Sequence, residues 1–326
     1  MSTSMQVYRS LEEIPPGLGP TVASIGNFDG LHRGHRTILA AARSEAQRLG
    51  ARVAVVTFDP HPMQILKPEA APETLTPTEE KLRLLEQAGV DIAVVLPFSR
   101  AFSQLSAREF LQQVLAARLG TVSLHEGSNF RCGHRAEAGM DELQLLGAEM
   151  GFAVHAHAAV VVRRQEVSST VIRARLREGN VNAARWMLGR CFSVHSHPAR
   201  GRGIGSRQLA PTVNLAEYPG MLPRAGVYVT RLGVDGPTGM RWMEAVSNVG
   251  WRPTVGEPSF AVETHILDFE PMELTESTAL ELEFRHWLRP EIKWPDVASL
   301  KAQIARDVHR ARRYFALAGR LGQRLE

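Results

Sequence analysis

Short apolar runs alternate with amphipathic stretches over the first half of the chain. The strand-like runs are residues 21–25, 53–58, 92–96 and 154–158. The helical stretches are residues 37–43, 79–87, 107–118 and 141–150. The runs are short, apolar and rich in β-branched residues, which is typical of strands buried on both faces. This alternation predicts an α/β domain with a doubly wound, Rossmann-like parallel sheet, whose ligands bind at the carboxyl ends of the strands.

The pattern changes in the second half. Residues 171–188 predict a helical connection that Gly179 and Asn180 break into two, and we place the domain boundary at its end, giving domains 1–188 and 189–326. Turn signals then recur about every ten residues, which predicts an antiparallel sheet or small β-barrel. The strand-like pieces are residues 226–230, 242–248, 261–269 and 279–285. An amphipathic helix over residues 300–317 ends the pattern. Its apolar face holds Ile304, Val308, Ala311, Tyr314 and Phe315.

Composition narrows the class of protein. A chain of 326 residues with 44% hydrophobic residues fits two domains with sizeable cores. No apolar run approaches the ~20 residues of a membrane span, and no secretion signal is visible, so we expect no membrane partner. The two cysteines, far apart, indicate a reducing cytoplasm. A net charge of +4 suits anionic small molecules as well as nucleic acid. Weak self-association stays open.

The strongest chemical signal is the glycine-rich turn at residues 26–35, between a strand and a helix. Its three glycines permit close approach of the backbone, and the helix N-terminus directs N–H groups at one spot, as phosphate binding requires. His32 and His35 can reach the same anion. The alternative is an ordinary strand–helix turn with incidental histidines, which the glycines and the preceding strand make the weaker interpretation.

The segment G-N-F-D-G-L-H-R-G-H resembles the H-x-G-H signature of the nucleotidyltransferase superfamily. More narrowly, it is similar to the G-x-F-D-G-x-H-x-G-H segment of prokaryotic bifunctional riboflavin kinase/FMN adenylyltransferases. The resemblance implies catalytic roles for His32 and His35. It also implies that Gly26, Asn27, Phe28, Asp29 and Gly30 bind the nucleotide or flavin.

Three further segments of the first half extend the resemblance. F-D-P-H-P at residues 58–62 is either a stiff strand-end turn or the border of a ligand pocket, and the family has a very similar segment. The turn at residues 126–133 carries Cys132 where the family has a second aromatic. V-S-S-T-V-I-R at residues 167–173 matches the family's S-S-T-x-I-R and would hold the departing phosphates. The binding residues so implied are Phe58, Pro60, His61, Asn129, Ser168, Ser169 and Thr170, with Arg173 as a catalytic residue.

The second half continues the resemblance. A glycine-rich basic loop at residues 201–207, with P-T-V-N at 211–214, resembles the riboflavin kinase loop, although Leu209-Ala210 replaces the common G-F. The family relation implies that Thr212 and Asn214 contact the phosphates and Mg²⁺. V-E-T-H-I-L-D at residues 262–268 implies that Glu263 is the base for the riboflavin hydroxyl; by its residues alone it is an ordinary strand carboxylate. The other binding residues so implied are Gly201, Arg202, Gly203, Asn248 and Arg289.

The resemblance covers residues 22–315 and implies two reactions. Riboflavin and ATP would give FMN, and FMN and a second ATP would give FAD and pyrophosphate, with Mg²⁺ as cofactor. Three alternatives stay open: an enzyme with one active half, a flavin-binding sensor without turnover, and an H-x-G-H ligase acting on tRNA. The modest net charge and the absence of a basic, aromatic-rich face count against a nucleic-acid partner.

Overall fold

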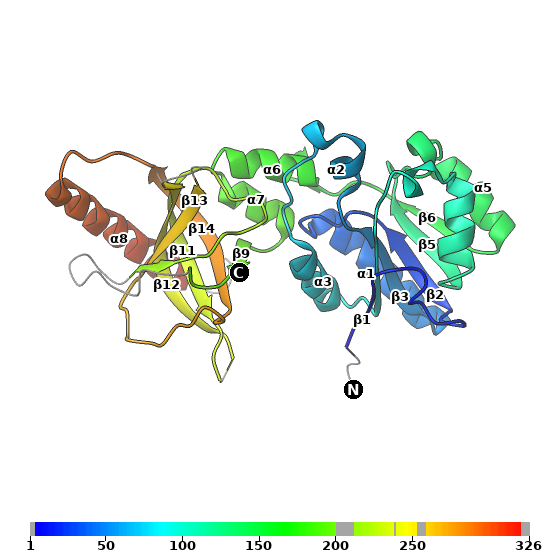
Figure 1. The fold of residues 1–326 in the computed structure, drawn as a ribbon, viewed down its shortest axis with the longest axis horizontal. Helices are drawn as coiled ribbons and strands as arrows, with labels where there is room; N and C mark the ends of the chain where they lie inside the picture. Colours follow the sequence, from blue (N-terminus) through cyan, green and yellow to red (C-terminus); the bar gives the residue numbers. More distant parts are fainter. Residues whose placement is uncertain (1–3, 200–211, 238, 253–258, 321–326) are drawn as a thin grey trace. The chain divides into compact units, whose positions relative to one another are not determined.

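The computed structural model describes residues 4–199, 212–237, 239–252 and 259–320 (Figure 1). The chain divides into two compact units, Met1–Ser169 and Thr170–Glu326, which we describe one at a time. None of the described helices has the length and apolar run that a bilayer crossing needs.

A six-stranded parallel sheet forms the first unit. Its order is β1-β4-β3-β2-β5-β6. The strands are β1 (Gln6–Tyr8), β2 (Thr21–Ile25), β3 (Arg52–Phe58), β4 (Ile92–Leu96), β5 (Thr121–Gly127) and β6 (Ala153–His157). The chain winds outward from β2 in one direction through β3 and β4, then in the other through β5 and β6. The direction therefore reverses between β2 and β5, where sheets of this type bind their ligands.

Helices cover both faces of this sheet. Alternate residues of β3 show why: Val53 and Val55 pack with α1 and α3, whereas Ala54 and Val56 pack with α5 and the helical turns before β5. The helices are α1 (Arg33–Leu49), α2 (Pro62–Leu66), α3 (Thr78–Gln87), α4 (Ala107–Phe110) with a π-helical continuation (Leu111–Ala116), and α5 (Met140–Met150). A short hairpin of β7 (Val161–Val162) and β8 (Gln165–Glu166) precedes the second unit.

The predicted elements of this half are confirmed, with three corrections. The strand predicted at residues 154–158 is β6, but it lies at the sheet edge and none of its residues is buried, so the expectation of burial on both faces was wrong. Sequence inspection missed β5, and Glu126 and Gly127 end that strand instead of opening a turn. The single helix predicted at residues 107–118 winds as a π-helix over its second part.

The second unit is an antiparallel six-stranded sheet, order β10-β13-β12-β11-β14-β9. Backbone hydrogen bonds from Ala199 to Asn214 and from Ala216 to His197 join the two sheet edges at one end, as in a barrel. The helices α6 (Ser169–Arg177) and α7 (Val181–Leu188) precede it. The strands are β9 (Phe192–Ser196), β10 (Thr212–Asn214), β11 (Gly226–Val234), β12 (Arg241–Arg252), β13 (Ser259–Ile266) and β14 (Leu280–Pro290).

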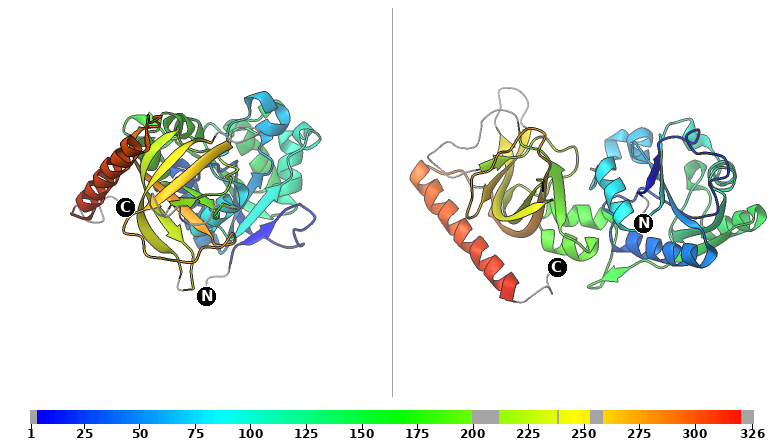
Figure 2. Two further views of the ribbon diagram at one scale, coloured as in Figure 1. Left: turned by 60° about the vertical axis from the view of Figure 1, so that its left-hand side comes forward. Right: turned by 90° about the horizontal axis from the view of Figure 1, so that it is seen from below.

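The last helix, α8 (Val297–Arg320), lies against this sheet in both views of Figure 2. Four residues of its predicted apolar face, Val308, Ala311, Tyr314 and Phe315, pack with strand residues such as Val229, which confirms that interpretation. Strands β9 and β10 were not predicted, and β13 stops at Ile266, three residues before the predicted end. Both cysteines are free thiols, as expected from their positions.

Candidate functional site

The turn between β2 and α1 brings the two predicted histidines into contact. His32 is the N-cap of α1, and its Nδ1 accepts a hydrogen bond from the backbone N–H of His35 at 3.3 Å. The two imidazole rings stack with centroids 3.7 Å apart. Gly34 makes this possible, because a Cβ there would lie 3.1 Å from the His32 ring. The rings therefore sit together at the helix N-terminus, where an anion is favoured.

His35 has a buried ring nitrogen that can still form a hydrogen bond. Its Nδ1 has no hydrogen-bond partner among the described residues. Burial lowers the pKa of His35 well below its ordinary value, and the charges of His32 and Lys81 lower it further, so the ring is neutral near pH 7. A buried polar atom without a partner costs about 1–3 kcal/mol, which a bound ligand can recover.

A strained loop surrounds the histidines. Phe28 and Leu31 adopt φ values of 47° and 35°, which side chains other than glycine rarely take. The Asp29 carboxylate fixes the loop by accepting bonds from the N–H groups of Leu75 and Thr76, at 3.0 and 2.9 Å. Phe28 and Asp29 are thus buried supports of the loop, whereas Gly26 and Asn27 are partly exposed.

Two charged residues of this region escaped sequence inspection. The Nζ of Lys81, on α3, lies 3.3 Å from the Thr57 hydroxyl, and burial lowers its pKa against the opposing effect of Asp29 and Asp59. Glu126, at the end of β5, is buried and accepts bonds from Ile25 N–H and the Ser24 hydroxyl. A lysine on the apolar face of a predicted amphipathic helix was the available signal for Lys81. Glu126 had no signal, since β5 was not recognised.

The segment after β3 contributes an aromatic wall. Phe58 lies 5.6 Å from Phe98 and 6.0 Å from Phe102, ring centroid to centroid, and all three rings are only partly buried. Such a wall can hold an aromatic ligand face by stacking. His61 has a local role, because its Nδ1 accepts a bond from Met63 N–H and caps α2. Pro60 precedes it and is also partly exposed.

The remaining predicted residues of this half surround the same strand ends or begin α6. Asn129 is exposed just after β5, on the far side of the switch point from Asn27. The hydroxyl of Ser169, the last residue of the first unit, donates to the Asp29 carbonyl at 2.8 Å. Ser168 and Thr170 flank it. Arg173 is buried one helical turn beyond Ser169, on the same face of α6.

In the second unit, strand register aligns the predicted residues. Asn214 of β10 pairs with Glu263 of β13, and Glu263 pairs with Asn248 of β12. The row continues through Val227 of β11 to Arg289 of β14. Residues that are directly opposite on adjacent strands point to the same face, with Cβ atoms about 4.5–5.5 Å apart. Four predicted residues therefore share one row of one sheet face.

This row borders a cavity of about 390 Å³. Thr212, Asn248, Glu263 and Arg289 line it, so β10, β12, β13, β14 and α8 all contribute walls. Sequence inspection missed Asp307 of α8, which is buried and accepts bonds from the Arg289 guanidinium at 2.8 and 2.9 Å. Arg289 also lies over Trp294, 5.7 Å from the ring centroid. The arginine is thereby held rigidly in the cavity wall.

The cavity has the oxygen donors that Mg²⁺ prefers. Thr212 and Asn214 alternate with the buried Val213, so their side chains emerge on the side opposite to it, beside the Glu263 carboxylate. These residues fit a hydrated Mg²⁺. Gly201, Arg202, Gly203, Leu209, Ala210 and Pro211 lie outside the described residues.

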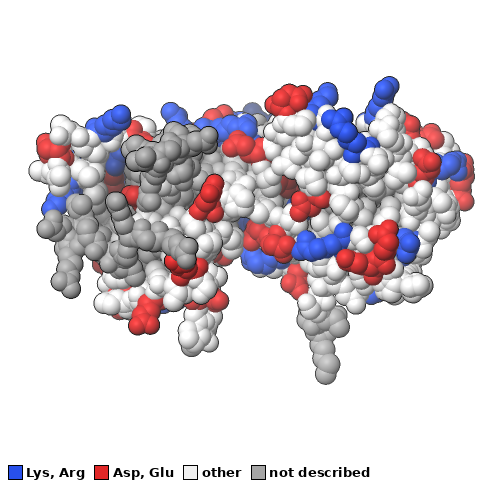
Figure 3. Space-filling view, viewed as in Figure 1, with Lys and Arg blue, Asp and Glu red and all other residues white. Residues whose placement is uncertain are grey.

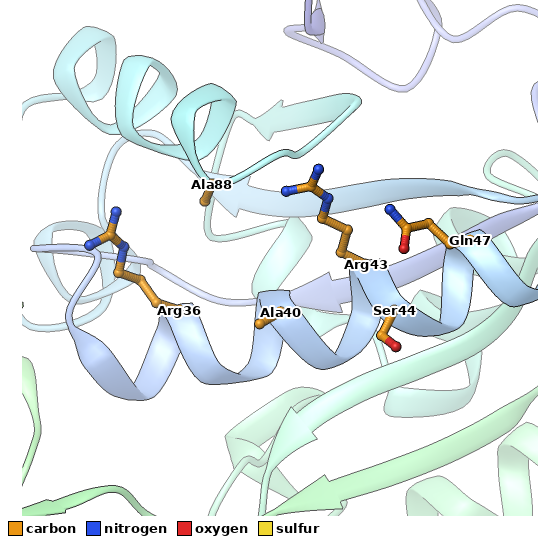
Figure 4. Close-up of a pocket in the computed structure, with 6 residues that line it drawn as sticks. All are labelled: Arg36, Ala40, Arg43, Ser44, Gln47 and Ala88. Atoms are coloured by element: carbon orange, nitrogen blue, oxygen red, sulfur yellow. The ribbon is translucent and has the colours of Figure 1, made fainter.

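One hollow of the first unit is lined by none of the predicted residues. A hollow of about 310 Å³ lies between α1 and the end of α3 (Figure 4). Its lining residues are Arg36, Ala40, Arg43, Ser44, Gln47 and Ala88. Acidic and basic side chains are interspersed on the face in Figure 3.

Comparison with known proteins matches both halves. The family model described as FAD synthetase matches residues 15–171, and that described as riboflavin kinase matches residues 188–315. The bifunctional riboflavin kinase/FMN adenylyltransferase of Pseudomonas fluorescens is 35% identical over 94% of this chain and 97% of its own. This chain belongs to the bifunctional riboflavin kinase/FMN adenylyltransferase family.

Other members of the family show similar coverage. The protein of Haemophilus influenzae is 31% identical over 95% of this chain and 99% of its own, and that of Escherichia coli K12 is 34% identical over 91% and 93%. The fold is shared with a Streptococcus pneumoniae crystal structure titled a macrolide-efflux protein. That structure has a TM-score of 0.83 and 23% identity, and the match covers 95% of this chain and 99% of that one.

Proposed function

We propose that the chain converts riboflavin to FAD in two ATP-dependent steps at two separate sites, one in each proposed domain, residues 1–188 and 189–326. The observation that best supports this proposal is the presence of two chemically different sites. One is a histidine pair at a helix N-terminus, and the other is a carboxylate beside a hydroxyl and an amide at a cavity. A protein that only captured flavin would need neither arrangement.

The second unit phosphorylates riboflavin. The 5′-hydroxyl oxygen of riboflavin forms a bond to the γ-phosphorus of ATP, and ADP leaves. Glu263 accepts the proton of that hydroxyl. Thr212 and Asn214 would hold Mg²⁺, which supplies charge neutralisation of the phosphates when bound. Asn248 and the fixed Arg289 border the cavity that receives the flavin or nucleotide. Positioning and electrostatics supply most of the rate enhancement in such transfers.

The first unit adenylylates FMN. An oxygen of the FMN phosphate attacks the α-phosphorus of ATP, the α–β bridge bond breaks, and pyrophosphate leaves. No protein nucleophile is required, because the FMN phosphate is already an anion. His32, His35 and the N–H groups of α1 stabilise the developing charge. The end of the proposed first domain, residues 1–188, supplies the groups that bind the departing phosphates: Ser168, Ser169, Thr170 and Arg173. The partly exposed Phe58 wall receives the flavin ring.

The division between activities is proposed at residues 188 and 189. The compact units divide earlier, after Ser169, so α6 and α7 belong spatially to the second unit. In support of the proposed boundary, the riboflavin kinase match begins at residue 188, where α7 ends. We keep the cytoplasm as the proposed location, which suits two free thiols.

Three reaction mixtures test the function. Riboflavin with ATP and Mg²⁺, FMN with ATP and Mg²⁺, and riboflavin alone are incubated with the protein and separated by chromatography. We expect FMN and then FAD from the first mixture, FAD from the second and no product from the third. Product from only one of the first two would identify a single active half. Tight retention of flavin without any product would indicate a sensor.

A further inference from the structure

A cluster of three histidines and a glutamate lies in the first unit, apart from the histidines of the β2–α1 turn. Glu45 comes from α1, His125 from β5, and His155 and His157 from β6. We call these four residues the Glu45 cluster. Glu45 is ten residues along α1 from His35, which corresponds to about 15 Å at 1.5 Å per residue. The cluster is therefore separate from the proposed adenylylation site.

The fold aims these side chains at one point. His125 and His155 are register partners on adjacent parallel strands, so their side chains share a face of the sheet, and α1 packs on that face. His125 Nε2 lies 2.5 Å from Glu45 Oε2, and His155 Nε2 lies 3.4 Å from the same oxygen. One ligand atom from each of Glu45, His125 and His155 lies within 4.8 Å of the other two.

Two of these separations can be compared with those of a tetrahedral metal centre. Ligand bonds of about 2.0–2.2 Å place neighbouring donor atoms about 3.3 Å apart. The His155–Glu45 distance already meets this value. The short His125–Glu45 distance is that of a shared proton, and replacing the proton by a cation requires the two groups to part by roughly 0.8 Å.

From this geometry we propose that Glu45, His125 and His155 bind a borderline divalent cation of the zinc type, with water in the fourth position. Two imidazoles and one carboxylate suit Zn²⁺ far better than Mg²⁺, which takes oxygen ligands and retains its own waters. The His155 side chain is 44% exposed, so the cation has a route from solvent.

His157 supports the proposed ligands. Its Nε2 lies 2.9 Å from His125 Nδ1, on the opposite side of that ring from Glu45. When His125 Nε2 ligates a cation, Nδ1 carries the proton and donates it to His157. This is the arrangement that orients metal-bound histidines in other proteins. Ser123 serves Glu45 similarly, donating from its hydroxyl at 3.1 Å.

The side chains are also available in their ligating forms. Burial lowers the pKa of His125 and of His157 below the ordinary value. For Glu45, burial opposes ionisation, but hydrogen bonds from His125 and Ser123 outweigh it and leave its pKa lowered. These directions favour the neutral rings of His125 and His157 and the carboxylate form of Glu45.

The test is a Zn²⁺ titration of the full chain, untagged and stripped with a chelator, in competition with a chromophoric zinc indicator. Mg²⁺ is kept in excess and nucleotide is left out. We expect one Zn²⁺ per chain. His155→Gln, at the exposed ligand, should weaken binding at least tenfold, and His157→Gln should weaken it by about 10–100-fold. His309→Gln, an exposed histidine of α8, is the matched control and should bind like the wild type.

Co²⁺ provides a readout of the ligands themselves. Bound at this site it should give the visible absorption of a four-coordinate nitrogen–oxygen centre, and His155→Gln should abolish that band. Circular dichroism and thermal melting check that each variant folds. Fewer than one Zn²⁺ per wild-type chain would overturn the proposal. So would unchanged affinity in folded His155→Gln, which would leave the cluster a hydrogen-bonded support between α1 and the sheet.

Discussion

The two proposed sites are built in opposite ways. The histidine pair of the first unit lies within ten consecutive residues, and the strand–turn–helix geometry alone brings the rings together. In the second unit, Asn214, Glu263, Asn248 and Arg289 are dispersed over more than seventy residues, and only the register of the sheet aligns them. A site of the first kind depends on a local backbone shape. A site of the second kind depends on the whole barrel.

Replacing Glu263 should separate the two sites by the largest effect, a loss of one activity and not of the other. Glu263→Gln keeps the size of the side chain but removes the base, so riboflavin phosphorylation should fall by about 10²–10⁴-fold. FAD formation from supplied FMN should be unchanged, because the first unit is untouched. Glu270→Gln, at an exposed carboxylate that pairs with Arg241, is the control. Equal loss of both activities in a folded Glu263→Gln protein would contradict separate sites.

Replacing His35 should have the converse effect. His35→Ala removes the ring whose buried Nδ1 awaits a partner, and FAD formation from FMN should fall by about 10²–10³-fold. Conversion of riboflavin to FMN should continue at the wild-type rate. His309→Ala serves as a control for the loss of a histidine. The measurement is the rate of each product with its own substrate, and an unaffected FAD rate would remove His35 from the mechanism.

The site of the second unit should lose stability when the buried ion pair in its wall is broken. Asp307 is buried in α8 and pairs with Arg289, and Asp307→Asn removes the charge of that buried pair's carboxylate. We expect the free energy of unfolding of the second unit to fall by about 3 kcal/mol. Asp268→Asn is a matched control, because Asp268 pairs with Arg312 of the same helix at the surface, and should cost less than about 1 kcal/mol. Urea denaturation measures both, and equal effects would contradict the importance of burial.

The smallest effect concerns Glu126, beneath the first site. Burial raises the pKa of this carboxyl well above its ordinary value, against the hydrogen bonds from Ile25 and Ser24. The folded chain therefore holds the proton to higher pH than the unfolded chain, and stability falls as pH rises through that interval. Glu126→Gln cannot ionise, so it should stabilise the first unit at pH 8 and have little effect at pH 4. A stability difference independent of pH would contradict this account.

Local pattern was sufficient to predict much of the fold. The strands β2, β3 and β4 and the helices α1, α3 and α5 follow directly from apolar periodicity, because each buries a regular face. β5 escaped because Ser123, His125 and Glu126 interrupt its apolar run, and their polar partners, Glu45 and the β2 backbone, are distant in sequence. β10, with three residues, is too short to have a period of its own, and β9, with five residues, buries only Phe192 and Val194.

The sites divide in the same way. His32 and His35 could be proposed from the turn itself. Glu263 was proposed only through the family resemblance. By its own residues it is an ordinary strand carboxylate, and it becomes distinctive only when strand pairing places Asn214 and Asn248 on either side of it. Asp307 and Lys81 share this property: each is a charged residue on a helix whose partner belongs to another element.

The central claim is that each proposed domain performs one reaction independently, and a mixing experiment tests it most directly. His35→Ala and Glu263→Gln proteins are combined in one tube with riboflavin, ATP and Mg²⁺, and FAD is followed over time. Separately, neither variant should form FAD from riboflavin at an appreciable rate. Together they should, because FMN made by the first protein is released and adenylylated by the second. A mixture of folded variants that yields no FAD would contradict the account.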